Sequence, residues 1–234
     1  MSKLQSWAVV LPAHNSAANI SETVAELTDY FESHQLNGQV VIVENGSTDS
    51  TWNVMALIDS SNLPFELIRT RSEKGLGNAI RQGLKSVTTE FVLITADDLP
   101  FGFSDIDVYR KSFSAHEIAI GSKAHPDTDG NRSLSREIMS TVFRMLRRFI
   151  VRVDLGDTQG SIMGRASVIC SIASHTQQTE YLMTTEFLAI ATRAGSTIIE
   201  LLVKYRNNVR KSNIKIIEDS IAMLRGLFEL RRQL

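Results

Sequence analysis

The stretch FVLITADDLP, residues 91–100, decides the fold class. Its first four residues form an apolar run typical of a buried strand, and the carboxylates of Asp97 and Asp98 follow it. A buried strand that ends in paired acids delivers them to the carboxyl edge of a sheet, where open α/β folds bind ligands. Because adjacent carboxylates repel each other, they favour a cation such as Mg²⁺ or Mn²⁺. An acidic turn or a helix N-cap is the alternative interpretation of this stretch.

Strands and helices alternate before this stretch. Apolar runs at residues 7–11, 39–43 and 65–70 predict three earlier strands. Helical patterns follow them: one begins at Asn19 or Ser21 and ends before Gly38, one follows the turn after residue 46, and one covers residues 78–87. This alternation predicts an α/β fold, with a mainly parallel sheet that carries helices on both faces.

The second half of the chain is less regular. The elements predicted there are a helix at 105–116, a strand at 117–121, a helix at 134–153, a loop with a short strand at 157–165, a helix at 185–194 and a strand at 197–203. The end of the chain has the pattern of an amphipathic helix, or of two. We therefore predict an α/β domain over residues 1–211 and a C-terminal helical tail over residues 212–234.

Composition and charge exclude several classes of protein. The 234 residues carry a formal net charge of −1, so we expect no nucleic-acid partner. The single cysteine, Cys170, excludes an internal disulfide and a multi-cysteine metal site. No secretory signal pattern precedes the first strand, and no stretch approaches the roughly 20 apolar residues of a membrane span. We therefore expect a cytoplasmic protein.

Loops follow each of the first four predicted strands. They cover residues 12–16, 44–49, 74–78 and 97–100. Because the carboxyl ends of parallel strands meet at one edge of a sheet, all four loops are expected there, where a nucleotide would bind. Asp49 is expected to cap the following helix or to brace its loop.

The residue types in these loops suit a nucleotide. Glu44 and Asn45 can form hydrogen bonds to a base, and Glu44 can accept one from an N–H edge. Lys74, with Gly75 and Gly77, offers a positive charge and close backbone approach to phosphate. Each residue taken singly also has an ordinary interpretation as a turn or surface residue. No GxxxxGK(S/T) or GxGxxG motif occurs at these loops, which argues against a P-loop kinase and a dinucleotide enzyme.

Four ordered motifs carry a resemblance to a known family. VVLPAHNSAANI, VIVENGSTDST, KGLGNAIRQGL and TADDLP resemble the inverting glycosyltransferases of family 2, which have a GT-A (Rossmann-like) fold and use nucleotide-sugar donors. The later segments GSKAHPD, SREIMSTVFRMLRR, DTQGSIMGR and TTEFLAIATRAGSTIIELLVKYRN resemble the branch that transfers mannose or glucose to dolichyl or polyprenyl phosphate. The similarity covers residues 7–208.

The resemblance assigns roles on the donor side. The residues of the implied nucleoside-binding loop are Pro12, Ala13, His14 and Asn15. Glu44 and Asn45 stand where the family has two aspartates, and Lys74 lies where a basic residue approaches the base or the phosphates. Asp97 matches the metal-binding acid of the family's DxD motif, and Asp98 is the second candidate ligand for Mg²⁺ or Mn²⁺.

The resemblance also assigns roles on the acceptor side. Lys123 and Arg136 match positions that face the acceptor phosphate, and Asp157 and Gln159 match a loop that could hold the sugar or the metal. The implied catalytic set is therefore Asp97, Asp157, Gln159 and Arg136. Arg136 has the alternative interpretation of a solvated helix arginine.

Four positions depart from the family pattern. Thr95 replaces the first acid of DxD, His14 a tyrosine, Ser16 a glutamate and Asn45 an aspartate. The predicted site has therefore lost negative charge. Weaker metal binding, a different base preference and loss of activity are the three consequences that the sequence leaves open.

The expected reaction transfers a hexose from GDP-mannose or UDP-glucose to a polyprenyl or dolichyl phosphate, with inversion. A phosphate acceptor is already anionic near neutral pH and needs no strong general base. One alternative is a family-2 enzyme with a soluble acceptor hydroxyl, which needs a base such as Asp157 or Glu186. The other is a non-catalytic protein that binds nucleotide sugars.

Two helices indicate a further partner. The predicted helix at 134–153 carries a broad apolar stripe punctuated by the arginines Arg136, Arg144, Arg147, Arg148 and Arg152. An apolar stripe fringed by arginines is typical of a helix at an anionic bilayer interface, and the tail has a similar pattern. We expect peripheral membrane contact. Packing on the sheet, or a face for a second copy or a membrane-anchor protein, is the alternative.

Overall fold

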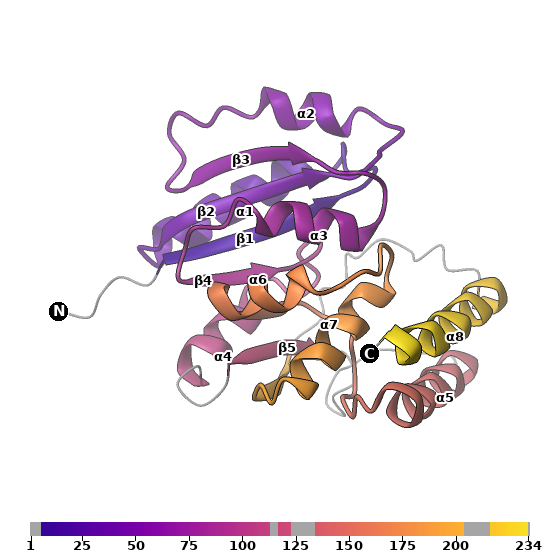
Figure 1. Cartoon of the computed structure of the whole chain (residues 1–234). Coiled ribbons are helices and arrows are strands. Elements are labelled where there is room, and N and C mark those ends of the chain that lie inside the picture. The colour runs from indigo at the N-terminus through magenta and orange to yellow at the C-terminus, as the bar shows by residue number, and fades with distance from the viewer. Residues whose placement is uncertain (1–5, 113–116, 123–133, 204–215, 234) are drawn as a thin grey trace.

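The chain forms one mixed β-sheet flanked by helices (Figure 1). The computed structural model describes residues 6–112, 117–122, 134–203 and 216–233. Its strands are β1 (Ser6–Ala13), β2 (Asn37–Glu44), β3 (Glu66–Arg71), β4 (Phe91–Ile94), β5 (Ile118–Ser122), β6 (Ile162–Arg165) and β7 (Ile198–Leu202). Within the described residues the order across the sheet is β3-β2-β1-β4-β6-β5-β7. The predicted α/β class, with helices on both faces, is confirmed.

The described helices cover both faces of this sheet. They are α1 (Ile20–Ser33), α2 (Thr51–Leu57), α3 (Leu76–Leu84), α4 (Ser104–Ser112), α5 (Leu134–Val151), α6 (Ala166–Ser174), α7 (Leu182–Arg193) and α8 (Ile216–Gln233). Successive strand side chains point to opposite faces. Val9 and Leu11 therefore pack with α1, α2 and α4, whereas Ala8 and Val10 pack in a second core with α3, α6 and α7.

One strand runs against the others. β1 pairs in parallel with β2 and β4, and β2 pairs in parallel with β3, as predicted. β6 is antiparallel to both β4 and β5, which gives β4 and β5 the same direction. The first residue of β6, Ile162, therefore pairs with Ile94 at the end of β4. The loop that precedes β6 therefore lies at the carboxyl edge.

Several element boundaries differ from the prediction. The segment ASVICSIAS, which we did not assign, forms α6, because its small and branched apolar residues pack one face on the sheet. α7 begins three residues before the predicted start at 185, and α3 covers Leu76–Leu84 rather than 78–87. α5 ends at Val151 rather than 153, where Arg152 adopts the left-handed conformation (φ 61°) that terminates helices.

Helices α5 and α8 lie side by side at the end of the molecule away from α2 (Figure 1). Ile150 of α5 and both Leu227 and Leu230 of α8 are buried in the core that includes α7. The described tail residues therefore form a single helix that packs on the domain. The predicted boundary between residues 211 and 212 lies outside the described residues and stays a prediction. None of the described helices combines the length and apolar character needed to cross a membrane.

Candidate functional site

The ends of three neighbouring strands meet at one edge of the sheet. Pro12 and Ala13 end β1, Glu44 ends β2 and Arg71 ends β3. The parallel register pairs Ala13 with Glu44, and Glu44 with Arg71. This places the loops after β1, β2 and β3 side by side, as the strand order predicted.

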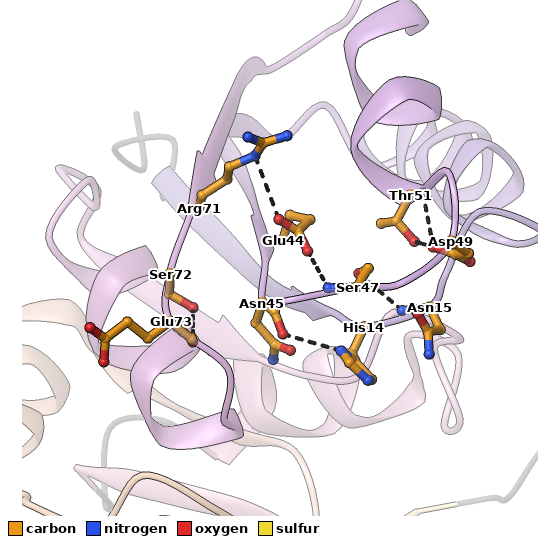
Figure 2. Close-up of polar contacts among 10 residues, drawn as sticks. All are labelled: His14, Asn15, Glu44, Asn45, Ser47, Asp49, Thr51, Arg71, Ser72 and Glu73. Atoms are coloured by element: carbon orange, nitrogen blue, oxygen red, sulfur yellow. Dashed lines mark hydrogen bonds and ion pairs between the residues drawn. The ribbon is translucent and has the colours of Figure 1, made fainter.

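Asn15 joins the first of these loops to the second (Figure 2). Its backbone N–H donates to Ser47 Oγ at 3.1 Å, and its side-chain Oδ1 accepts from the Thr48 N–H at 2.8 Å. Its φ of 53° lies in the left-handed region, which asparagine tolerates better than most residues. The predicted nucleoside-binding residue thus has a structural task, which is to fix the loop after β1 against the loop after β2.

Asp49 closes the same loop pair. Its Oδ1 accepts from the Thr51 N–H at 2.9 Å and from the Thr51 hydroxyl, while Oδ2 accepts from the Ala17 N–H at 3.2 Å. Thr51 Oγ1 in turn accepts from the Ser16 N–H at 2.7 Å. Asp49 therefore braces the start of α2 against the loop after β1, in agreement with the role expected for it.

His14 and Asn45 form hydrogen bonds that join the same two loops. The Nδ1 of His14 donates to the Asn45 carbonyl oxygen at 3.1 Å, which requires the proton on Nδ1. The Asn45 N–H donates to the Ala13 carbonyl at 3.0 Å. Both predicted nucleotide-binding residues lie at the predicted edge, and Figure 2 shows them close to Glu44 and Ser47.

Glu44 is held by two groups. It is 8% exposed; Oε1 accepts from the Ser47 N–H at 2.5 Å, and Oε2 lies 3.5 Å from Arg71 Nε. The Arg71 guanidinium stacks over the Trp52 ring at 3.9 Å from the ring centroid. Because an ionised carboxylate offers about four acceptor positions, Glu44 can still accept from a ligand. Arg71 and Trp52 were not predicted from the sequence, because their place beside Glu44 follows from the pairing of β2 with β3.

The loop after β3 packs against the loop after β2. A Cβ at Gly46 would lie 3.0 Å from the Cβ of Lys74, so the two loops are in contact. The Lys74 side chain is exposed. The Gly77 N–H donates to the Thr179 carbonyl at 2.7 Å, and a Cβ at Gly77 would lie 2.2 Å from the carbonyl oxygen of Gln178. Glycine at this position is thus required by the close approach of the segment before α7.

The acids after β4 lie at the same edge. The Thr95 N–H donates to the Val10 carbonyl at 3.2 Å, which continues the β1–β4 pairing beyond the strand. The Thr23 hydroxyl of α1 donates to the Asp97 carbonyl oxygen, and the side chains of Asp97 and Asp98 are both half-buried. The structure therefore brings Asp97 to the edge at which the loops after β1 and β2 meet.

The predicted acceptor-side loop reaches this edge through β6. Since Ile162 pairs with Ile94, the residues just before β6 lie at the same edge of the sheet as those just after β4. Asp157 Oδ1 accepts from the Gln159 N–H at 2.8 Å, and the Asp157 N–H donates to Glu200 Oε1 at 3.0 Å. Gln159 is exposed, and its Nε2 donates to the Tyr181 carbonyl at 3.1 Å.

A buried arginine supports this loop from behind. Arg147 Nη1 donates to Thr158 Oγ1 at 3.0 Å, and Thr158 Oγ1 lies 3.0 Å from Thr185 Oγ1. The expectation that Arg147 belongs to an exposed arginine fringe is wrong, because its side chain is only 2% exposed. Burial lowers the pKa of this guanidinium, and the nearby charges of Asp157 and Glu200 act in the opposite direction.

Three other candidate residues have different outcomes. Arg136 lies in the first turn of α5, but its side chain is outside the described residues, as is the whole of Lys123. Glu186 is 2% exposed, and its Oε2 accepts from the N–H groups of Gln177 and Gln178 at 2.9 and 2.8 Å. This carboxylate thus holds the segment that contacts Gly77.

The donor set at the edge suits a hard cation that also binds phosphate. No cluster of three or more His, Cys, Asp or Glu side chains able to hold a metal occurs in the described part of the chain. Mg²⁺ is commonly held by only one or two carboxylates together with substrate phosphates and water. Asp97 and Asp98 therefore fit a metal that arrives with a diphosphate better than one caged by protein alone.

The chain is similar in sequence to known glycosyltransferases. Residues 8–173 match the family model described as Glycosyl transferase family 2. The dolichyl-phosphate beta-glucosyltransferase of Saccharomyces cerevisiae is 25% identical over 95% of this chain and 73% of its own length. The dolichol-phosphate mannosyltransferase of Pyrococcus furiosus is 32% identical, over 49% of this chain and 32% of its own length.

Solved structures share the fold. A crystal structure of glucosyl-3-phosphoglycerate synthase from Mycobacterium tuberculosis, in complex with Mn²⁺, UDP and phosphoglyceric acid, matches with a TM-score of 0.65. The match covers 97% of this chain and 77% of that chain at 16% sequence identity. The expected GT-A fold is thereby confirmed.

Proposed function

The chain belongs to glycosyl transferase family 2, and from this premise we propose that it transfers a hexose from a nucleotide diphosphate sugar to a polyprenyl or dolichyl phosphate with inversion. The observation that carries the proposal is the meeting of two sets of residues at one sheet edge. The loops after β1, β2 and β3 and the acids after β4 form the donor side. The Asp157–Gln159 loop, which precedes β6 at the same edge, forms the acceptor side.

The donor-side residues select the base by hydrogen-bond polarity. The Glu44 carboxylate is an acceptor with the Arg71 donor beside it. Uracil and guanine each present a ring N–H next to a carbonyl oxygen, which complements this pair. Adenine and cytosine present a ring nitrogen acceptor, which the carboxylate would repel. This supports a UDP or GDP donor, and the names of the relatives, a glucosyltransferase and a mannosyltransferase, agree with UDP-glucose or GDP-mannose.

The diphosphate would lie between Lys74 and Asp97. A divalent cation held by Asp97, with Asp98 as the second ligand, would neutralise the charge on the leaving diphosphate. Lys74 is exposed at the same edge and can approach the phosphates. Asn15 and Asp49 would keep the loops rigid, so that little ordering entropy is lost when the nucleotide binds.

The acceptor phosphate would attack from the opposite side of the sugar. One of its oxygens forms a bond to C1 as the bond between C1 and the diphosphate oxygen breaks, which inverts the configuration at C1. The phosphate is anionic before it binds, so positioning dominates over proton removal. We assign positioning of the acceptor to Asp157, Gln159 and Arg136.

The α5–α8 pair supports an acceptor that is held in a membrane. Val142, Met145 and Phe149 of α5 are exposed at i, i+3 and i+7, and Phe228 of α8 is exposed as well. The exposed basic residues on α8 are Arg225, Arg231 and Arg232. Apolar and basic side chains on adjacent helices complement an anionic bilayer surface. We propose that this face makes the peripheral membrane contact; the cytoplasmic location stays a prediction.

The direct test is product formation. The purified chain is incubated with UDP-glucose or GDP-mannose, Mn²⁺ and polyprenyl phosphate in detergent, and lipid-linked hexose is measured by mass spectrometry. We expect a lipid-linked product with one donor, its loss when EDTA removes the metal, and the opposite anomeric configuration to the donor. Absence of product with both donors, from a sample that unfolds cooperatively on heating, would overturn the proposal. Product with a soluble saccharide acceptor alone would identify the other acceptor class.

A further inference from the structure

Arg147 differs from the two arginines that follow it, Arg148 on α5 and Arg152 just after the helix. Arg148 and Arg152 are exposed, and Arg148 Nη2 forms a surface ion pair with Asp154 Oδ2 at 3.4 Å. Arg147 is instead almost fully buried. Burying a guanidinium is costly, and an apolar residue of similar volume often stabilises such a position better. Packing of α5 alone therefore does not account for an arginine here.

The buried guanidinium reaches one short segment of chain. Nη1 donates to Thr158 Oγ1 at 3.0 Å, and Nη2 donates to the Leu155 carbonyl oxygen. Nε has no hydrogen-bond partner among the described residues. The planar fork of arginine can engage two oxygens at once, which fixes the direction of the segment between Leu155 and Thr158. Asp157 lies within that segment.

The same segment is fixed from two other elements. Thr158 Oγ1 lies 3.0 Å from the hydroxyl oxygen of Thr185 on α7. The Asp157 N–H donates to Glu200 Oε1 on β7 at 3.0 Å. Arg147 supplies the contact from α5, so it ties that helix to the loop that carries Asp157 and Gln159. In the helical repeat of 3.6 residues, Arg147 points away from the exposed stripe of Met145 and Phe149.

We propose that Arg147 is a positioning residue for the acceptor: it holds the loop that carries Asp157 and Gln159 in the orientation that receives the acceptor phosphate. The proposal rests on the proposed function for the identity of the acceptor. It adds that the helix facing the membrane and the acceptor loop are joined by one buried side chain. Arg147 would act through its hydrogen bonds to Thr158 and Leu155 and not on the substrates.

The test compares three variants of the full chain. Arg147→Met removes the fork but keeps similar apolar volume, and Arg147→Lys keeps the charge but not the fork. Arg165→Met, the matched control, removes an exposed arginine that forms a surface ion pair with Glu90 at the opposite edge of the sheet. We expect Arg147→Met to lower kcat/KM for polyprenyl phosphate about 30-fold, with KM for the nucleotide sugar unchanged. Arg147→Lys should recover part of that loss, and Arg165→Met should match the wild type.

Hydrogen exchange gives a readout that does not depend on turnover. In Arg147→Met, the amides of Asp157 and Gln159 should exchange at least about tenfold faster, while those of Ser47 and Thr51 keep their wild-type rates. Thr158→Val removes the acceptor from the other end of the bond, and serves if Arg147→Met does not fold. Wild-type acceptor kinetics and wild-type exchange in this loop would overturn the proposal.

These outcomes separate this inference from the proposed function. If the wild type makes no lipid-linked product while the loop exchanges faster in Arg147→Met, the proposed acceptor is wrong and the positioning role stands. If the wild type makes the product and the variant loses donor affinity instead of acceptor kcat/KM, the positioning role is wrong and the proposed function stands.

Discussion

The two halves of the sheet edge are built differently. On the donor side, the loops after β1 and β2 are linked by hydrogen bonds from backbone N–H groups to the side chains of Asn15 and Asp49 (Figure 2). On the acceptor side, the described loop before β6 is fixed by Arg147 of a helix whose opposite face exposes apolar side chains. The loops of the donor side are therefore held mainly by each other. The loop of the acceptor side is held by a helix that also exposes apolar side chains to solvent.

This difference fits the two substrates of the proposed reaction. A nucleotide sugar arrives from water, and a rigid set of loops binds it with little loss of conformational entropy. A polyprenyl phosphate arrives with its chain in a bilayer, so the protein must approach the lipid surface. The α5–α8 pair is the part of the described structure that offers apolar and basic side chains for that contact.

The largest effect on the transfer rate is expected at Asp97, which lies between the donor side and the acceptor side of the sheet edge. Asp97→Asn keeps the shape of the side chain but removes its charge, so it should lower transfer at least about 100-fold. The free energy of unfolding, measured with urea in the absence of nucleotide, should change by no more than about 0.5 kcal/mol, because Asp97 lies outside the hydrophobic core. Initial rates of lipid-linked product measure the first effect.

Asp98→Asn shows whether the loss of transfer rate is specific to Asp97. As the second candidate ligand, Asp98 should give a smaller loss, of about tenfold. Equal losses in the two variants would show that the two carboxylates share the metal. A greater loss at Asp98 than at Asp97 would contradict the assignment of Asp97 as the main ligand.

The next effect concerns the rigidity of the donor side. Asp49→Ala removes the acceptor for the N–H groups of Ala17 and Thr51, so it should lower the free energy of unfolding by about 2 kcal/mol. Affinity for UDP or GDP with Mn²⁺, measured by calorimetry, should fall about tenfold. The matched control is Asp59→Ala, which removes an exposed aspartate that accepts from the Ser61 N–H. A control that loses as much nucleotide affinity would refute the special role of Asp49.

The last effect concerns the proposed membrane face. Phe149 is 76% exposed on α5, and Leu57 is 84% exposed on α2 at the other end of the molecule. Phe149→Asp should weaken binding to vesicles that contain phosphatidylserine about tenfold, because an apolar anchor becomes an anion. The unfolding free energy should stay within about 0.5 kcal/mol of wild type. Vesicle flotation measures the binding.

Leu57→Asp is the control for this surface. This variant also replaces an exposed apolar residue with an acid, but on the donor half of the molecule. It should leave the fraction of protein that floats with the vesicles unchanged. Equal loss of flotation in both variants would mean that charge alone governs binding. Unchanged flotation in Phe149→Asp would remove the α5–α8 face from the proposal.

The sequence predicted the donor half well because its signals are local. The strand at 91–94 was recognisable because a strand buried on both faces is an unbroken apolar run. The role of Asp49 followed from the preference of aspartate for the start of a helix. Arg71 was missed, because its importance comes from its register beside Glu44, which only the pairing of β2 and β3 reveals.

The acceptor half was less predictable because its contacts are tertiary. The antiparallel direction of β6 cannot be read from its four residues, IMGR, yet that direction brings the loop that carries Asp157 to the same sheet edge as Asp97. The pattern of α5 showed an apolar stripe with arginines, but not which arginine turns inward. Only the packed structure separates Arg147, which is buried, from Arg148, which is exposed.

The central claim is that a cation at Asp97 carries the donor diphosphate at this sheet edge. A crystal soaked with Mn²⁺ and UDP or GDP tests it most directly, because manganese gives an anomalous signal. We predict an anomalous peak within about 2.2 Å of an Asp97 carboxylate oxygen, with the diphosphate on the same ion. A diphosphate bound elsewhere, or a manganese ion held away from the end of β4, would contradict it.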